Sequence, residues 1–173
     1  MTMTETKLIV LRGPSGSGKS TVAKAVRATQ GRTMALVEQD YLRRIVLKEK
    51  DVPNGVNIGL IKQTVLFALE HSYDVMLEGI FYAEHYGGMF EEILRAHPEG
   101  NHFFYFDIPF EETLRRHQTR PNKDAFGEKQ MRAWYRPKDI LTCVEERVIE
   151  ENSTVDETSA LILTSCGLFI PNA

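Results

Sequence analysis

Short apolar runs alternate along the chain with longer segments in which apolar residues recur at helical spacing. Four runs are continuous enough for strands buried on both faces of a sheet, and they span residues 8–11, 34–37, 73–77 and 102–107. A fifth run, with polar edges, covers residues 144–149. Strands that alternate with helices in this order predict an α/β fold.

In the segments between these runs, apolar residues recur at helical spacing. Asn57 and Ser153 stand where an N-cap is needed, and Pro109 suits the first helical position because its φ angle is already helical. The apolar face of the segment after Asn57 should belong to the core. The expected helices cover residues 21–28, 57–69, 83–97 and 155–164, and two more begin at Asp40 and at Pro109.

A glycine-rich octet lies between the first strand and the first helix. Residues 13–20 read GPSGSGKS, which fits the phosphate-binding pattern G-x-x-x-x-G-K-[ST]. Glycines allow the backbone to turn tightly and to point N–H groups at phosphate oxygens, and the following helix aims its positive end at the anion. The residues expected to bind the phosphates of a nucleotide such as ATP are Gly13, Pro14, Ser15, Gly16, Ser17, Gly18, Lys19, Ser20 and Thr21.

Acidic residues follow the second and third strands, where open α/β sheets place their ligands. Asp40 is a candidate base for an acceptor hydroxyl, or simply the cap of the helix that begins there. Glu78 is a candidate ligand of Mg²⁺ together with the Ser20 hydroxyl, or a hydrogen-bonded acid at a strand end. Lys19 would place its charge on the β- and γ-phosphates.

The composition suits one domain over residues 1–173, with 42% hydrophobic and 26% charged residues. No apolar run approaches the ~20 residues of a membrane span, and the first residues lack an apolar signal region. Cys143 and Cys166 lie far apart without the spacing of metal ligands. We therefore expect two reduced thiols in a cytoplasmic protein.

The net charge of −3 conceals a basic segment. From Arg115 to Lys138 the chain carries eight Lys or Arg residues against two acidic ones, a net charge of +6 in an otherwise acidic protein. Such a segment indicates a local anionic ligand rather than a surface for long duplex nucleic acid. Because residues 121–137 lose helical periodicity around Gly127, we expect a lid that closes over phosphates and supplies arginines to them.

The order of these parts resembles the small P-loop kinases, which include shikimate, gluconate and adenylate kinases, zeta toxins and the kinase domain of polynucleotide kinases. The resemblance extends from Lys7 to about Thr164, and it is closest to bacterial kinase-like proteins of undetermined substrate. It implies a single-domain P-loop kinase fold with a five-stranded parallel sheet in the order 2-3-1-4-5, flanked by helices. It also implies ATP and Mg²⁺ as cofactors.

The resemblance also implies roles for single residues. Asp40 and Arg43 match a D-x-x-R pattern, similar in form to that of polynucleotide kinases, in which the aspartate activates the acceptor hydroxyl. Arg116 and Arg120 match the R-x-x-x-R that precedes the lid and touches the nucleotide and its phosphates. The expected catalytic set is Lys19, Asp40, Arg116, Arg120 and Arg132, with Arg136 as a further lid arginine and with Asp40, Arg43 and Glu78 on the acceptor side.

Three functions fit these features. The first is ATP- and Mg²⁺-dependent transfer of the γ-phosphate to a hydroxyl of a small molecule. The second is phosphorylation of a nucleic acid 5′-hydroxyl, which the D-x-x-R form and Trp134 as a stacking surface favour and the acidic remainder of the chain disfavours. The third is a nucleotide-dependent switch, which the lid and the lack of a guanine-reading motif disfavour. The identity of the acceptor and the oligomeric state stay open.

Overall fold

The computed structural model describes residues 6–121 and 123–170, and its centre is a sheet of five parallel strands. The strand order is β2-β3-β1-β4-β5, and each pair of neighbours is parallel. The predicted α/β class and the implied strand order are therefore confirmed. The strands are β1 Leu8–Arg12, β2 Met34–Glu38, β3 Asp74–Gly79, β4 Asn101–Asp107 and β5 Arg147–Glu150.

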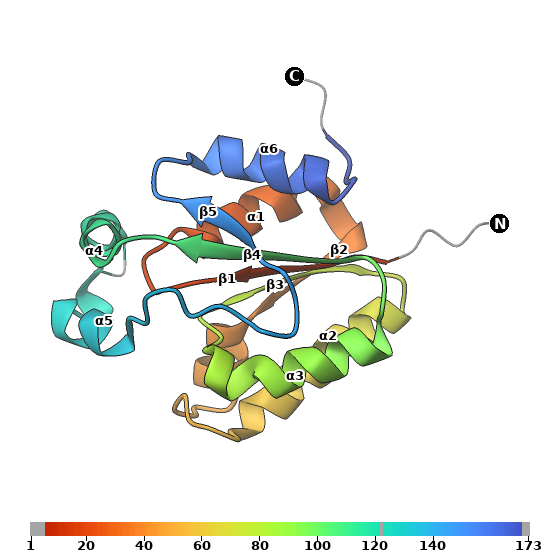
Figure 1. The fold of residues 1–173 in the computed structure, drawn as a ribbon, viewed down its shortest axis with the longest axis horizontal. Coiled ribbons are helices and arrows are strands. Elements are labelled where there is room, and N and C mark those ends of the chain that lie inside the picture. The colour runs from red at the N-terminus through yellow and green to blue at the C-terminus, as the bar shows by residue number, and fades with distance from the viewer. Residues whose placement is uncertain (1–5, 122, 171–173) are drawn as a thin grey trace.

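Helices cover both faces of this sheet (Figure 1). Helices α1 and α6 pack together on one face, and α2 and α3 pack together on the other. Helices α4 and α5 lie beyond the carboxyl end of β4 (Figure 1). None of the described helices is long and apolar enough to cross a lipid bilayer. The helices are α1 Lys19–Gln30, α2 Val56–Glu70, α3 Ala83–Ala96, α4 Phe110–Gln118, α5 Glu128–Trp134 and α6 Val155–Ser165, with short helical turns at Gly31–Thr33, Tyr41–Val46 and Lys123–Ala125.

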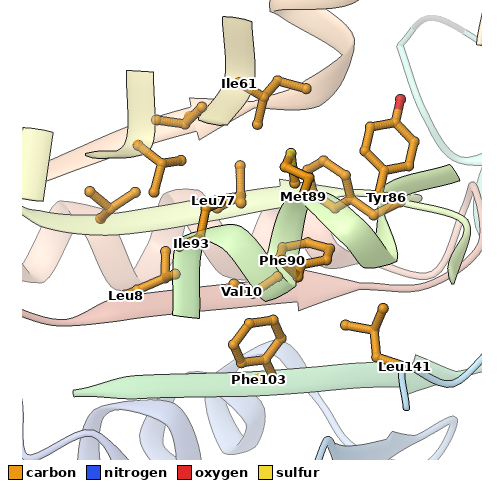
Figure 2. Packing of buried hydrophobic residues seen from close by; sticks show 14 of the residues in the cluster. Leu8, Val10, Ile61, Leu77, Tyr86, Met89, Phe90, Ile93, Phe103 and Leu141 are labelled. Atoms are coloured by element: carbon orange, nitrogen blue, oxygen red, sulfur yellow. The ribbon is translucent and has the colours of Figure 1, made fainter. Parts of the chain in front are cut away.

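The central strand β1 supplies side chains to two apolar layers. Leu8 and Val10 pack in the layer between the sheet and helices α2 and α3, which Figure 2 shows from close by. Ile9 and Leu11 pack in the layer between the sheet and helices α1 and α6, where the free thiol of Cys166 is also buried. A strand that is buried on both faces must be apolar throughout, and this explains why β1 forms a continuous apolar run.

The start of α2 differs from the prediction. Gly55 occupies the N-cap position, and Asn57 lies fully buried in the first turn. The carboxylate of Glu49 takes over the capping role, because it accepts from the backbone N–H groups of Val56 and Asn57 at 2.8 Å each. The Asn57 side chain therefore caps no helix: its amide nitrogen donates to Glu49, and its amide oxygen accepts from the Tyr86 hydroxyl.

Other element ends also shift. Thr154, rather than Ser153, caps α6, because the Thr154 hydroxyl accepts from the Glu157 backbone N–H while the Glu157 carboxylate accepts from the Thr154 N–H. Pro109 occupies the N-cap of α4, one residue before its predicted position. The expected lid, residues 121–137, contains the regular helix α5 with a buried Met131, and its Asn122 lies outside the described residues.

A buried arginine ties the central strand to the segment that follows α5. Arg12, the last residue of β1, is 0% exposed. Its Nη1 donates to both carboxylate oxygens of Glu146, at 2.9 and 2.7 Å, and its Nη2 donates to the carbonyls of Phe81 and Asp139, at 2.8 and 2.9 Å. Because Arg12 directly precedes the glycine-rich octet, these bonds fix where the octet begins.

We expect Arg12→Met to lower the free energy of unfolding by about 3–5 kcal/mol, because it leaves the buried Glu146 carboxylate without a counter-charge. The double variant Arg12→Met/Glu146→Leu should recover most of this loss. Urea denaturation of both variants measures the difference, and Lys24→Met, which removes an exposed ion pair with Glu38, serves as the control with a change below about 1 kcal/mol. Equal losses in the single and double variants would contradict the argument.

Candidate functional site

The octet forms a loop that packs tightly against neighbouring elements. Gly13 and Gly16 have φ angles of +141° and +84°, which side-chain-bearing residues rarely adopt. A Cβ atom on Gly13 would lie 2.7 Å from the Phe106 carbonyl oxygen, and one on Gly16 would lie 2.6 Å from the Thr113 carbonyl oxygen. The glycines are therefore required both by the turn and by the close approach of β4 and α4.

Lys19 begins α1 and turns its side chain back into the loop. Its ammonium group donates to the Pro14 carbonyl at 2.7 Å and to the Ser17 hydroxyl at 3.2 Å. Burial lowers the pKa of Lys19; the negative charge of Glu78 opposes this shift and the positive charge of Arg120 adds to it, so that the pKa lies at about 8. The ammonium is thus a cation held in a low-dielectric setting, which an anionic ligand would relieve.

Ser20, in the first turn of α1, and Glu78, near the end of β3, meet at the same point. Glu78 is level with Leu11 of β1 in the sheet, and its carboxylate accepts from the Ser20 hydroxyl at 2.9 Å. Burial raises the pKa of Glu78, while Lys19 and the Ser20 hydrogen bond counteract that rise. A hydroxyl beside a buried carboxylate fits a hard divalent cation such as Mg²⁺. No group of three or more His, Cys, Asp or Glu residues surrounds it in the described part of the chain, so water and phosphate would supply the other ligands.

Asp40 lies just beyond β2 with an exposed carboxylate. It accepts from Arg43 at 2.9 Å and lies 3.6 Å from Arg44. Its side chain makes no capping hydrogen bond, although its backbone is the N-cap of the helical turn Tyr41–Val46. That turn has π-helical hydrogen bonding, which is rare in proteins and is frequently found at functional sites.

One pocket collects seven of the predicted site residues. It brings four residues of the octet together with both acidic strand ends and with Arg120, whose pKa is lowered by burial. Thr21 is exposed on α1 and is not part of this lining. The pocket is lined by Ser15, Gly16, Lys19, Ser20, Gln39, Asp40, Glu78, Gly79, Ile80 and Arg120.

The other two arginines of the predicted catalytic set lie outside this pocket, as do Arg43 and Arg136. Arg116 lies behind the loop, where its guanidinium donates to the carbonyls of Ser17 and Glu151 at 2.8 Å each. Arg132 is exposed on α5, where it pairs with Glu128 at 2.7 Å and stacks over the Phe110 ring at 4.2 Å from the ring centroid. For Arg132 to reach a phosphate in the pocket, α5 would have to move.

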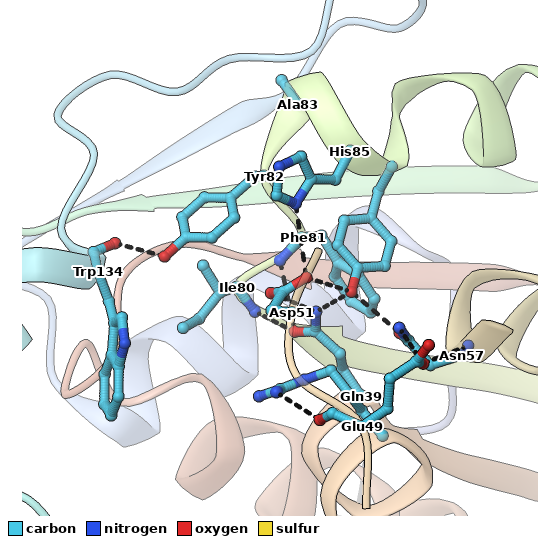
Figure 3. A network of polar contacts seen from close by, with 12 residues as sticks. Gln39, Glu49, Asp51, Asn57, Ile80, Phe81, Tyr82, Ala83, His85 and Trp134 are labelled. Atoms are coloured by element: carbon cyan, nitrogen blue, oxygen red, sulfur yellow. Dashed lines mark hydrogen bonds and ion pairs between the residues drawn. The ribbon is translucent and has the colours of Figure 1, made fainter. Parts of the chain in front are cut away.

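Gln39 is a site residue that the sequence patterns did not single out. It is 2% exposed, and its side-chain oxygen accepts from the backbone N–H of Ile80 at 2.8 Å and of Phe81 at 3.4 Å. Its amide nitrogen donates to the Tyr86 hydroxyl at 2.8 Å. Gln39 therefore joins the ends of β2 and β3 to the polar network in Figure 3. Its position directly before Asp40, at a strand end, was the available signal.

Comparison with family models matches residues 8–138 of the chain to the AAA domain. The chain belongs to this family. Together with the octet, the strand order and the solved structures described next, this match gives the protein the fold of the small P-loop kinases. A search of curated proteins found no match.

Several solved structures share the whole fold. The tunicamycin resistance protein of Deinococcus radiodurans is 14% identical with a TM-score of 0.66, and the match covers 97% of this chain and 99% of that one. A gluconokinase from Sinorhizobium meliloti is 14% identical with a TM-score of 0.65, over 94% and 93% of the two chains. The Mycobacterium tuberculosis APS kinase, solved with AMPPNP and APS, is 17% identical with a TM-score of 0.67, over 92% and 96%. At these identities the likeness establishes the P-loop kinase fold.

We expect Lys19→Ala to abolish stabilisation by Mg·ATP while the free protein still folds. At 100 times Kd, ligand binding stabilises a protein by about 2.7 kcal/mol, which amounts to several degrees in Tm. Thermal melting with and without Mg·ATP measures the shift, and Lys24→Ala, an exposed lysine on the same helix, is the matched control. A wild-type shift in the Lys19→Ala variant would mean that the octet is not the nucleotide site.

The lowered pKa of Lys19 predicts a pH dependence of nucleotide affinity. Bound phosphates favour the charged ammonium, so above pH 8 binding must add a proton to Lys19, and the affinity should fall about tenfold between pH 7 and pH 9. Titration calorimetry in two buffers of different ionisation enthalpy would detect the proton uptake. Lys19→Arg keeps its charge and should lose this pH slope, and an unchanged slope in that variant would assign the effect to another group.

Proposed function

We propose that the protein is an ATP- and Mg²⁺-dependent phosphotransferase that moves the γ-phosphate to a hydroxyl of a small molecule. The observation that carries the proposal is the shared pocket of Lys19, the Ser20–Glu78 pair and Asp40. Phosphoryl transfer demands little covalent chemistry of a protein, but it demands positioning and charge stabilisation. This pocket brings together a buried ammonium group, a hydroxyl–carboxylate pair of the kind that Mg²⁺ prefers and an exposed carboxylate, which supports the proposal.

A second crevice behind the loop suits the nucleoside part of ATP. Its walls include Gly18, Arg116, Ile149 and Thr154, so it continues directly from the octet. The Arg116 guanidinium is held by the carbonyls of Ser17 and Glu151 and would cover the base or the ribose. With the nucleoside there, the phosphate chain would extend through the loop toward Lys19.

The residues of the pocket divide the chemistry between them. Asp40 would accept the proton of the acceptor hydroxyl, and the hydrogen bond from Arg43 would hold the Asp40 carboxylate in one orientation. Lys19 and Arg120 would stabilise negative charge on the transferring phosphoryl group. A bound Mg²⁺, held by Ser20 and Glu78, would neutralise charge on the β- and γ-phosphates.

The lid would complete this arrangement. Arg132 sits on α5, where it pairs with Glu128 at the surface and stacks over Phe110, so closure of residues 121–137 over the phosphates would give up one exposed ion pair and that stacking contact. The net charge of +6 in the basic segment favours closure when an anion is present.

Phosphorylation of a nucleic acid 5′-hydroxyl is the second candidate. The Asp40–Arg43 ion pair supports it, since D-x-x-R is the form that resembles polynucleotide kinases. One similar solved structure is the Pnkp1/Rnl/Hen1 RNA repair complex, at 21% identity and a TM-score of 0.53, over 73% of this chain and 42% of that one. A transfer screen with small alcohols and with short 5′-hydroxyl oligonucleotides separates the two candidates.

We expect Asp40→Asn to bind Mg·ATP with nearly wild-type affinity but to transfer phosphate about 10²- to 10⁴-fold more slowly, which is the usual contribution of a general base. The measurement is kcat with the acceptor that the screen identifies, beside the thermal shift with Mg·ATP. Asp156→Asn, an exposed aspartate in the first turn of α6, is the matched control. A rate within threefold of wild type would remove Asp40 from the chemistry.

A further inference from the structure

Helix α4 is fixed against the glycine-rich octet at two points. The Thr113 carbonyl approaches Gly16 so closely that a Cβ atom on that glycine would lie 2.6 Å from the carbonyl oxygen. About one turn later, the Arg116 guanidinium donates to the Ser17 carbonyl at 2.8 Å. These contacts set the position of α4 relative to the octet, so any group that is held by the end of α4 is also placed relative to the phosphate pocket.

Arg120 lines the phosphate pocket two residues beyond the end of α4. Its guanidinium forms no hydrogen bond or ion pair with any described residue, and the influences on its pKa are burial and the negative charge of Glu78. A side chain without polar partners is directed only by its rotamer and by the position of its backbone. The place of this guanidinium in the pocket therefore depends on what holds the chain at residue 120.

Backbone hydrogen bonds hold Arg120 from both sides. Its N–H donates to the His117 carbonyl at 3.1 Å, and its carbonyl accepts from the Lys123 N–H at 3.2 Å. The first of these bonds continues the last turn of α4. The second fixes Arg120 only if Lys123, which is exposed in a short helical turn, is itself held in place.

The side chain of His117 holds that turn against α4. It is 1% exposed, and its Nε2 lies 3.0 Å from the Lys123 carbonyl oxygen and 2.8 Å from the Phe126 carbonyl oxygen. Carbonyl oxygens only accept, so Nε2 carries a proton and donates to both. The imidazole also stacks on the Phe126 ring, at 4.6 Å between centroids and 20° between planes. Through His117, the chain on the far side of Arg120 is therefore tied to the same helix as the near side.

The two contacts of His117 can be separated by substitution. Its Nδ1 is buried and has no partner among the described residues, so the polar function of the ring rests on the single N–H at Nε2. A glutamine keeps an N–H donor and loses the flat ring, whereas a phenylalanine keeps the ring and loses the donor.

We propose, on the basis of the function inferred above, that His117 is a positioning residue for phosphoryl transfer. Its N–H holds the carbonyls of Lys123 and Phe126 against α4, and this keeps the Arg120 guanidinium in the phosphate pocket. Arg120 there stabilises the charge that develops on the transferring phosphoryl group. His117 acts only through Arg120, because it is buried and is not part of the pocket lining.

Two variants distinguish the donor from the ring. His117→Phe leaves the two carbonyls without a donor and should lower the rate of ADP formation from Mg·ATP about 10- to 100-fold, as expected for a misplaced catalytic group. Its Tm shift with Mg·ATP should be unchanged. His117→Gln should keep most of the wild-type rate. ADP formation counts transfer to an acceptor and slow hydrolysis alike, so the assay does not require an identified acceptor. If packing of the ring were the whole role, the order of the two variants would be reversed, and that result would overturn the proposal.

A double-mutant cycle tests whether the effect passes through Arg120. Arg120→Ala should lower the same rate about 10²- to 10³-fold, the usual loss for one donor to developing charge. Adding His117→Phe to Arg120→Ala should cost no further rate, because the group that His117 positions is already absent. A full additional loss in the double variant would contradict the positioning role.

Hydrogen exchange in the ligand-free protein measures the hold without any activity. His117→Phe should speed exchange of the Arg120 and Lys123 N–H groups, and His117→Gln should speed it less. The matched control is His71→Phe. His71 ends α2, where its Nδ1 lies 2.7 Å from the Phe67 carbonyl oxygen and its ring stacks on Phe67 at 4.1 Å between centroids. This control should change neither the rate nor the exchange at Arg120 and Lys123, and wild-type exchange in His117→Phe would overturn the hold.

The outcomes distinguish this proposal from the one on which it rests. ADP formation that His117→Phe leaves unchanged would overturn the positioning role and leave the phosphotransferase standing. A wild-type protein with neither a Tm shift with Mg·ATP nor ADP formation would overturn the phosphotransferase and the role of His117 in transfer, while the exchange rates would still decide whether His117 holds Arg120. If His117→Phe does not fold, His117→Gln decides, and a rate in it as low as that of Arg120→Ala would overturn the proposal.

Discussion

The burial of opposite charges at the carboxyl end of the central strands is the constraint on which this site depends. Lys19 and Glu78 are 6% and 5% exposed. Burial lowers the pKa of Lys19 and raises the pKa of Glu78, because it disfavours the charged form of each side chain. Each offsets part of the other's desolvation, and Ser20 and the Pro14 carbonyl supply hydrogen bonds. Such a site is poised for a ligand that carries both signs of charge, as a phosphate chain with a divalent cation does.

The sheet order makes this arrangement possible. Because β1 lies between β3 and β4, the octet that follows β1 is flanked by Glu78 on one side and by the start of α4 on the other. The parallel direction of the strands brings their carboxyl ends to one edge, where Asp40 also lies. The Arg12 hydrogen bonds then attach the segment after α5 to the same edge.

The two sides of the site differ in rigidity. On the acceptor side, Gln39, Asp51, Asn57 and Tyr86 form a buried hydrogen-bond network that joins β2, β3, α2 and α3 (Figure 3). Satisfied buried networks of this kind hold one arrangement. On the side of the proposed lid, the exposed Arg132 is held by an ion pair with Glu128 and by stacking over the Phe110 ring. Exposed contacts of this kind are weaker than a buried network, so the proposed lid is the side that could move to admit a substrate and then exclude water.

The sequence by itself determined the strands, most helices, the octet and the proximity of Lys19, Ser20, Asp40 and Glu78. These features rest on local periodicity, on glycine conformations and on the rule that parallel strands end at one edge. The tertiary structure alone decided the partners of buried polar groups. Arg12 and its partner Glu146 are 134 positions apart in the sequence. Asn57 does not occupy the N-cap position that the sequence predicts, because its backbone N–H and its side chain bond Glu49 and Tyr86 instead. No local pattern encodes such pairs, since each partner is selected by the packing of distant elements and by the cost of leaving a buried polar group unpaired.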